Sequence, residues 1–299
     1  SSLIVPLTTE SDVKHKIALE LVNKIREFFN QLVEESNEIY GEILKIAQTQ
    51  WESWHNAIDE ASKALVLRKD KSPTFQLLLN SLHKQLNKNP ESLYEVLFLS
   101  QYGSKLSVAE KCLKESYLSQ TTDENNNDNE ESDILLNEAW SIYVEIFKEL
   151  SSFISSLNNV NLVDVSPSLA SLPQRKTSVQ LPGTTTAIHR FDETLTIIKS
   201  KQRPRKIAIY GIDGTKKTFL LKPNEDTRLD QRAMQLFTII SRFLPRRLQI
   251  ETYQVIPISS KVGLIGWIED TETLFELIRT ERKKWSISMF AEMNALNEK

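Results

Sequence analysis

The sequence is poor in the residues that build disulfides, metal sites and tight turns. Its 299 residues include one cysteine, Cys112, so neither a disulfide framework nor a cysteine-based zinc site can form within the chain. Its four histidines, at positions 15, 55, 83 and 189, lack the spacing of paired metal ligands. Seven glycines are few for a β-rich protein with many tight turns. These absences exclude disulfide-rich and zinc-finger classes and indicate a reducing compartment.

The chain also lacks a long hydrophobic run and an excess of one charge. Its apolar stretches, such as 96–99, are far shorter than the ~18 residues of a membrane span, and no signal peptide precedes them. With 37 basic and 40 acidic residues, the net charge of −3 excludes a uniformly basic nucleic-acid binder. The length suits about two domains. Because the chain does not begin with methionine, we expect a fragment.

The first half of the sequence has the apolar spacing of helices that pack together. One helix is expected from Asp12 to about Ala47, and shorter ones at 75–86, from 93 to about 118, and at 134–157. Between them, a stripe with three- and four-residue spacing predicts a helix with these core positions: Trp51, Trp54, Ile58, Ala61 and Leu65. A similar stripe on the last helix comprises Leu136, Ala139, Tyr143, Ile146, Leu150 and Phe153.

Two polar segments interrupt this pattern, and strands follow them. Residues 121–133 carry six acids and no base, which predicts a disordered loop. Residues 158–188 are rich in Ser, Pro, Asn and Thr, which indicates a linker. The later order is strand, strand, strand, helix, strand, strand. The expected strands are 195–198, 206–210, 217–222, 248–257 and 263–268, with helices at 226–244 and from Thr271.

Three features of the second half could carry chemistry. Lys222 ends a strand shortly before Glu225, and an ammonium held by a carboxylate suits a polyphosphate; a solvated lysine is the alternative. Five bases in 199–206 suit phosphate too, but no glycine-rich phosphate motif is present, so a solvated hairpin remains open. Trp267, at the end of a strand, could stack on a flat heterocycle or pack in a core.

A second apolar row lies beside the core stripe of the last bundle helix. Trp140, Val144 and Phe147 follow helical spacing, and Ile58, Ser62 and Val66 form a comparable row on an earlier helix. Two facing rows would form an apolar groove for a partner helix or a small molecule. A wide core face is the alternative.

Several segments together carry a family resemblance. The segments of the second half resemble the kinase N-lobe of the phosphatidylinositol-3-kinase-related protein kinases. The TOR (target of rapamycin) group of this family is most similar. The segments are 201–206, 211–214, 219–226, 230–237, 255–259 and 263–267. Upstream segments resemble the FRB domain, the rapamycin-binding four-helix bundle of that group; they are 51–55, 60–62, 102–103 and 138–143 with Phe147. Residues 3–50 resemble the last helices of the FAT region.

The resemblance implies an α plus α/β multidomain fold. Helices that end the FAT region would occupy 1–50, and the FRB bundle 51–157 with its acidic insert. A linker at 158–188 would lead to 189–299, which would form a five-stranded antiparallel kinase N-lobe with one αC-type helix, the hinge and the start of the C-lobe.

The resemblance also implies an ATP site. Lys222 would contact the phosphates, with Glu225 and Asp230 nearby. The adenine pocket and the hinge would comprise Leu220, Tyr253, Ile265, Gly266, Trp267 and Ile268, and the phosphate loop would lie between Ser200 and Pro204. No catalytic base or metal-binding loop follows the hinge, so no catalytic or metal residue is assigned, and this chain alone is expected to be inactive. The Mg²⁺ that accompanies ATP would be held in the C-lobe.

In the bundle, the resemblance implies a drug or partner groove. Its positions would be Ile58, Ser62, Leu65, Val66, Asn137, Trp140, Ser141, Val144 and Phe147. The family has aromatic residues where this chain has Leu65, Val66 and Val144, and an acid at Ser141.

The implied activity is transfer of the ATP γ-phosphate to serine or threonine of protein substrates, in nutrient and growth signalling. Expected partners are substrates, TOR-complex subunits and rapamycin with an immunophilin, in the cytoplasm or at the surface of endomembranes. A nonsense-mediated-decay-type kinase of the same family and a non-catalytic binding module that uses the groove are the alternatives; a lipid kinase fits less well because the bundle directly precedes the lobe.

Overall fold

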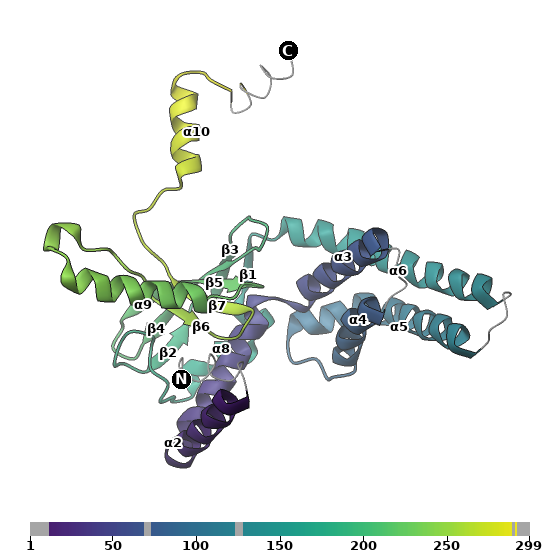
Figure 1. The fold of residues 1–299 in the computed structure, drawn as a ribbon, viewed down its shortest axis with the longest axis horizontal. Helices are drawn as coiled ribbons and strands as arrows, with labels where there is room; N and C mark the ends of the chain where they lie inside the picture. Colours follow the sequence, from purple (N-terminus) through teal and green to yellow (C-terminus); the bar gives the residue numbers. More distant parts are fainter. Residues whose placement is uncertain (1–11, 69–72, 123–127, 289–290, 292–299) are drawn as a thin grey trace. The chain divides into compact units, whose positions relative to one another are not determined.

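The computed structural model describes residues 12–68, 73–122, 128–288 and 291 (Figure 1). Within this part, the side chains of 65–78 and of the residues flanking the other gaps are outside the description. The chain divides into two compact units, Ser1–Gly266 and Trp267–Lys299. The first unit contains all the described strands and the helices α2–α9, so it holds most of the predicted site.

Four helices of the first unit form the expected bundle (Figure 1). They are α3 (Gln50–Arg68), α4 (Pro73–Leu86), α5 (Leu93–Thr122) and α6 (Asp128–Ser156). The stripe predicted on α6 is confirmed, because Ala139, Tyr143, Ile146 and Leu150 are fully buried. Their neighbours in the core include Trp54, Phe98 and Tyr102 from the facing helices, and the one cysteine, Cys112, is buried on α5. Large apolar side chains at helical spacing thus stabilise the bundle.

The acidic segment predicted as a disordered loop at 121–133 is partly helical. Thr121 and Thr122 end α5, and Asp128–Asp133 form the start of α6, while 123–127 lie outside the described residues. Acidic side chains in the first turn of a helix interact favourably with its dipole, which explains why α6 extends into this segment. Ser116 and Ser132 join the two helices there, since each hydroxyl donates to the carbonyl of the other residue, at 2.9 and 3.0 Å.

The preceding helix, α2 (Asp12–Ala47), packs against the segment that composition predicts as a linker. That segment is folded: it forms β1 (Asn159–Asn161), α7 (Leu162–Val165), α8 (Pro167–Ala170) and the 3-10 turn η1 (Leu172–Gln174). Its apolar residues follow helical spacing and are buried against the end of α2 and one face of the sheet. They are Leu162, Val165, Leu169 and Leu172.

The sheet is antiparallel and has seven strands in the described part of the chain, two more than the five predicted. The strand order is β1-β3-β4-β5-β7-β6, and β2 also pairs with β4. The remaining strands and helix are β2 (Ile188–Phe191), β3 (Thr194–Ile197), β4 (Arg205–Gly211), β5 (Lys216–Pro223), α9 (Arg228–Phe243), β6 (Val255–Pro257) and β7 (Val262–Gly266).

The two unexpected strands, β1 and β2, have only three and four residues. Strands so short show little alternation, and they are stabilised by the neighbours with which they pair. The strand expected at 248–257 is shorter than predicted, because Arg246–Leu248 form the 3-10 turn η2 and only Val255–Pro257 pair with β7.

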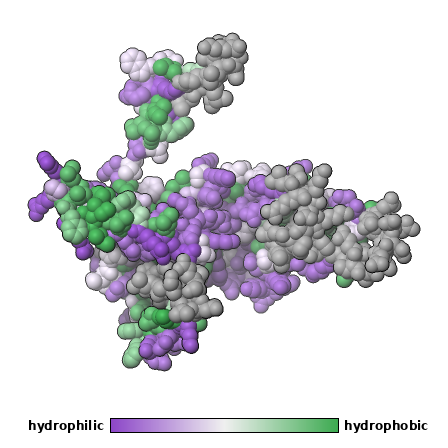
Figure 2. Space-filling view, in the orientation of Figure 1, coloured by the Kyte–Doolittle hydropathy of each residue, from purple (hydrophilic) through white to green (hydrophobic). Residues whose placement is uncertain are grey.

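Helix α9 presents hydrophobic side chains to solvent, as Figure 2 shows by the green patch over this helix. Leu229, Leu236, Ile239 and Phe243 are exposed, and no residue of α9 is buried.

The second unit contains α10 (Leu274–Lys284), in agreement with the helix predicted from Thr271. The Thr273 hydroxyl caps this helix by accepting a hydrogen bond from the Glu276 amide at 3.1 Å. Among the described residues, no helix is both long and apolar enough to cross a bilayer.

Candidate functional site

Lys222 forms an ion pair with Glu225 at the end of β5. Its Nζ donates to Glu225 Oε1 at 3.0 Å, and both side chains are partly exposed. Asn224, which lies between them in the turn, has a left-handed φ of 55°, and the Glu225 amide donates to the carbonyl of Lys261 at 3.0 Å. The β6–β7 loop therefore holds the carboxylate in place beside the ammonium. A fixed, partly exposed ammonium of this kind is suited to bind phosphate oxygens.

The sheet places apolar side chains next to Lys222. Side chains alternate along β5, so Leu220 and Lys222 are half-buried on one face while Phe219 and Leu221 are buried on the other. Leu220 pairs with Ile265 on β7, which makes these two side chains neighbours on the same face. The geometry thus provides an apolar surface beside a cation, which suits a ligand with a flat ring and a negatively charged tail.

The turn between β3 and β4 lies at the same end of the sheet as Lys222. Leu221 pairs with Arg205, so the next residue, Lys222, is level with Pro204 at the end of the turn. The turn is closed by a hydrogen bond from the Arg203 amide to the carbonyl of Ser200 at 3.2 Å. Ser200 is exposed and Pro204 is buried. The two residues predicted to flank a phosphate loop therefore flank an ordered turn beside the lysine.

The start of α9 differs from the prediction. The helix begins at Arg228, so Glu225 precedes it, whereas Asp230 lies in its first turn. Asp226 accepts a hydrogen bond from the Arg228 amide at 3.0 Å. The Arg228 side chain, which also donates to this carboxylate, lowers the pKa of Asp226 to about 2. Asp226 therefore keeps its negative charge at the helix start under all ordinary conditions.

Two residues near Lys222 were not singled out in the sequence. Gly263 pairs with Lys222 across the ladder, and the fully buried Thr227 side chain packs directly over it. A Cβ at position 263 would overlap Thr227 Oγ1 and would lie only 2.7 Å from Thr227 Cγ2. Gly263 thus permits the close approach of the segment that carries Glu225. The only sequence signal is a glycine inside an apolar strand.

The other predicted pocket residues lie at the end of β7. Gly266 ends this strand and donates its amide to the carbonyl of Gln254 at 2.7 Å, which places the adjacent, half-buried Tyr253 beside the same strand end. Trp267 and Ile268 belong to the second unit. There, Trp267 is half-buried and Ile268 is exposed, with its carbonyl accepting from Thr271 Oγ1 at 3.1 Å.

The bundle positions predicted to form a groove fall into three groups. Ile58 is a core residue with 2% of its surface exposed, so it cannot form an open wall. The side chains of Leu65 and Val66 lie outside the described part. The remaining positions are half-buried or exposed: Ser62, Asn137, Trp140, Ser141, Val144 and Phe147.

The α6 row of this groove has a defined neighbour on α3. The rings of Phe147 and His55 stack with their centroids 4.5 Å apart, and His55 Nε2 lies 3.0 Å from Ser151 Oγ. Trp140, Val144 and Phe147 are half-buried, in contrast to the fully buried Tyr143 between them. The helix thus has a surface row beside its core stripe, as the sequence predicts.

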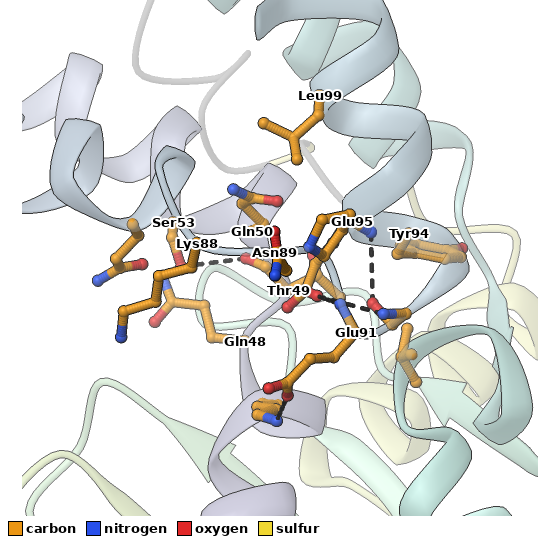
Figure 3. Close-up of a pocket in the computed structure, with 15 residues that line it drawn as sticks. Gln48, Thr49, Gln50, Ser53, Lys88, Asn89, Glu91, Tyr94, Glu95 and Leu99 are labelled. Carbon is orange, nitrogen blue, oxygen red and sulfur yellow. Dashed lines mark hydrogen bonds and ion pairs between the residues drawn. The ribbon is translucent and has the colours of Figure 1, made fainter.

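A polar cavity of about 310 Å³ lies at the base of the bundle (Figure 3). Several of its charged groups are engaged with one another, whereas Gln50 Oε1 is buried without a hydrogen-bond partner. Glu95 caps α5 by accepting from the amides of Glu91 and Ser92 at 2.6 and 3.2 Å. Burial lowers the pKa of Lys45, but ion pairs with Glu42 and Glu91 outweigh it and raise this pKa to about 12. The charged side chains at this cavity thus cap α5 and form ion pairs.

Comparison with known proteins gives two family matches. Residues 42–152 match the family model described as the FKBP12-rapamycin binding domain, and residues 216–298 match phosphatidylinositol 3- and 4-kinase. A chain that joins these two domains belongs to the class of phosphatidylinositol-kinase-related proteins.

Relatives over nearly the whole chain are more specific. The chain is 35% identical over 293 residues to the serine/threonine-protein kinase TOR of Oryza sativa, and 31% identical over 301 residues to the serine/threonine-protein kinase TOR2 of Saccharomyces cerevisiae. These alignments cover 94% and 96% of this chain, but only 11% and 12% of the relatives. The chain belongs to the TOR family and spans about a tenth of the length of these relatives.

Proposed function

We propose that the natural protein is a serine/threonine protein kinase that transfers the γ-phosphate of ATP to protein substrates in nutrient and growth signalling. The observation that carries the proposal is the Lys222–Glu225 ion pair, 3.0 Å long, on the open face of an antiparallel sheet. The names of the relatives, which are serine/threonine-protein kinases, support it.

In this proposal, ATP binds across the open face of β5 and β7. The Lys222 ammonium contacts its phosphates, Glu225 orients the ammonium, and Asp230 lies nearby at the start of α9. The adenine lies against side chains and backbone at the far end of these strands, contributed by Leu220, Tyr253, Ile265 and Gly266. Trp267 and Ile268, the next residues in the chain, are proposed as the rest of the hinge. The Ser200–Pro204 turn covers the phosphates. ATP supplies the phosphoryl group, and the proposal assigns neither the catalytic base nor the Mg²⁺ ligands to a residue of this chain.

We also propose the domain organisation that this function requires. Residues 1–50 end a FAT region, 51–157 form the FRB bundle, 158–188 form the folded connection that contributes β1 to the sheet, and 189–299 form the N-lobe, the hinge and the start of the C-lobe. The α6 row of Trp140, Val144 and Phe147 recruits protein substrates or complex subunits, or binds rapamycin with an immunophilin. The protein acts in the cytoplasm or at the surface of endomembranes.

The test uses the natural protein purified from its own cells. Lys222→Met removes the ammonium but keeps a side chain of similar length, so we expect phosphorylation of a serine-containing substrate to fall on the order of 10²-fold or more. Lys217→Met is the matched control, since Lys217 lies on the same strand but is exposed on the other face. This control should retain the full rate.

The same variants separate the alternatives. A Lys222→Met protein with unchanged phosphorylation and a Trp140→Ala protein that loses its partner would favour a non-catalytic binding module. A nonsense-mediated-decay-type kinase would lose activity with Lys222→Met as well, and a panel of candidate protein substrates would identify it.

A further inference from the structure

A buried ion pair joins the bundle to the sheet. Glu52, in the first turn of α3, and Arg205, the first residue of β4, are 5% and 1% exposed, and Arg205 Nη2 donates to Glu52 Oε2. The same carboxylate oxygen accepts from the amide and the hydroxyl of Thr49, both at 2.9 Å. Thr49 is visible in Figure 3, at the edge of the polar cavity. Thr49, the residue that precedes α3, thus fixes the carboxylate that also accepts from the arginine.

Arg205 connects this carboxylate to the turn beside Lys222. Its Nη1 donates to the carbonyl of Arg203 at 3.0 Å, and the Arg203 Nε lies 3.9 Å from Glu52 Oε1. Arg203 has a left-handed φ of 49°, an uncommon backbone conformation for a residue with a side chain. The hydrogen bond from Arg205 and the ionic contact with Glu52 are therefore both made with Arg203, the residue of this turn that has an unfavourable backbone conformation.

The end of α6 holds the same turn from a second direction. Arg203 Nη2 donates to the carbonyl of Ile154 and, at 3.4 Å, to that of Leu157. The C-terminal carbonyls of a helix carry partial negative charge, so this is a favourable place for a guanidinium. The first and the last helix of the bundle thus converge on the two arginines that border Pro204.

A buried ion pair is a costly way to hold two elements together. Apolar side chains of similar volume often give equal or greater stability, whereas an ion pair with fixed partners selects a single arrangement. Here the ion pair selects one position of the Ser200–Pro204 turn relative to Lys222. We therefore attribute the Glu52–Arg205 pair to fixing the position of this turn, and not only to raising the free energy of unfolding.

We infer that Glu52 is a positioning residue of the nucleotide site: through Arg205 and Arg203 it fixes the Ser200–Pro204 turn at the level of Lys222. This inference rests on the function proposed above. It gives the bundle a direct mechanical connection to the phosphate-binding turn.

The experiment measures steady-state phosphorylation by the natural protein purified from its own cells. Glu52→Gln keeps the shape of the side chain but removes its charge, so the turn loses its fixed position. We expect the KM for ATP to rise about tenfold while kcat stays within about twofold, since small displacements of a positioning group weaken ligand contacts. Arg203→Lys is the second variant. It keeps the charge at a partly exposed position and should raise the KM for ATP in the same direction.

Leu113→Ala is the control for a purely structural role. Leu113 is 1% exposed in the bundle core and lies on α5, which makes none of the contacts to the two arginines described above, so its truncation should lower the melting temperature without changing the KM for ATP. If Glu52→Gln and Arg203→Lys behave like Leu113→Ala, the inference is overturned while the proposed function stands. If Lys222→Met also leaves phosphorylation unchanged, the proposed function and this inference both fail.

Discussion

Gly263 decides how closely the Glu225 segment approaches the sheet. The buried Thr227 side chain occupies the space that a Cβ would take. Any larger residue must push Thr227 and its neighbours outward, and Glu225 lies two positions before Thr227. The position of the Lys222–Glu225 ion pair therefore depends on the absence of a side chain on the facing strand.

We predict that Gly263→Ala destabilises the chain by on the order of 1–3 kcal/mol, because an added methyl group overpacks this contact. Gly41→Ala is a suitable control, since a Cβ there meets nothing within 4 Å. Alanine is a better helix former than glycine, so this control should stabilise α2 by up to about 1 kcal/mol. Urea unfolding of both variants measures the difference. Equal stability changes of the same sign would contradict the proposed contact.

At the residue scale, the sequence predicts groups whose chemistry is visible in their type and spacing. Lys222 and Glu225 are an ammonium and a carboxylate three residues apart, and the ion pair between them follows from the turn. Thr227, Gly263 and the Glu52–Arg205 pair are different, because their roles depend on contacts between distant segments. Glu52 and Arg205 are separated by 153 positions, and no local pattern connects them.

Helix α6 presents a buried stripe and a half-buried row on two faces. Tyr143 and its stripe pack in the bundle core, whereas Trp140, Val144 and Phe147 form a half-buried surface row. Val144 stands where the TOR pattern has an aromatic residue. A valine offers less contact area than an aromatic side chain, which buries ~150–250 Å².

We predict that Val144→Tyr raises the affinity of the chain for a rapamycin–immunophilin complex by about tenfold, through the added apolar contact. Titration calorimetry with the preformed complex measures this. Val108→Tyr, at an exposed position of α5 outside the α6 row, adds the same ring elsewhere and should leave the affinity unchanged. No gain with Val144→Tyr would argue that the α6 row does not line the drug site.

The helices were easier to predict than the strands. Repeated three- and four-residue spacing over several turns identified α3 and α6, because each needs an apolar face, and the proline-containing breakers around 73 and 90 bounded α4 and α5. Strands β1 and β2 lacked such a signal. Segment 162–172 did carry helical spacing, but its serines and prolines are equally typical of a linker, and only packing against α2 decides between the two.

At the scale of the whole molecule, several helices of the described part expose large apolar side chains, and α9 is a clear case because none of its residues is buried. On α9, Leu236 and Ile239 are more than half exposed and Phe243 is 84% exposed. Exposed apolar patches of this kind mark surfaces that interact with other protein or promote association. The described part of the chain therefore combines well-packed cores with exposed hydrophobic surfaces, of which α9 carries one.

We predict that the purified chain binds the dye ANS and self-associates at high concentration. Changing Leu236 and Phe243 to glutamate should reduce both properties without unfolding the chain, because neither side chain is buried. Gln235→Glu adds a charge on the same helix and should have little effect. Fluorescence and sedimentation velocity give the two readouts. A clean monomer without dye binding would contradict this prediction.

The sequence also anticipated the order of the large elements, with helices first and an antiparallel sheet after them. It did not predict how the parts are joined, since the connection depends on buried charges and on a folded segment that resembles a linker in composition. Long-range contacts of this kind become visible only when distant residues are placed in space.

The single cysteine gives the bundle a built-in reporter of motion. Cys112 is 8% exposed on α5, and burial raises the pKa of its thiol, so we expect a thiol reagent to react with it much faster when the helices separate. Since no second thiol competes, the labelling rate of the native chain reports how often the bundle opens. This chain therefore carries a single-site chemical probe of opening in the bundle, without any substitution.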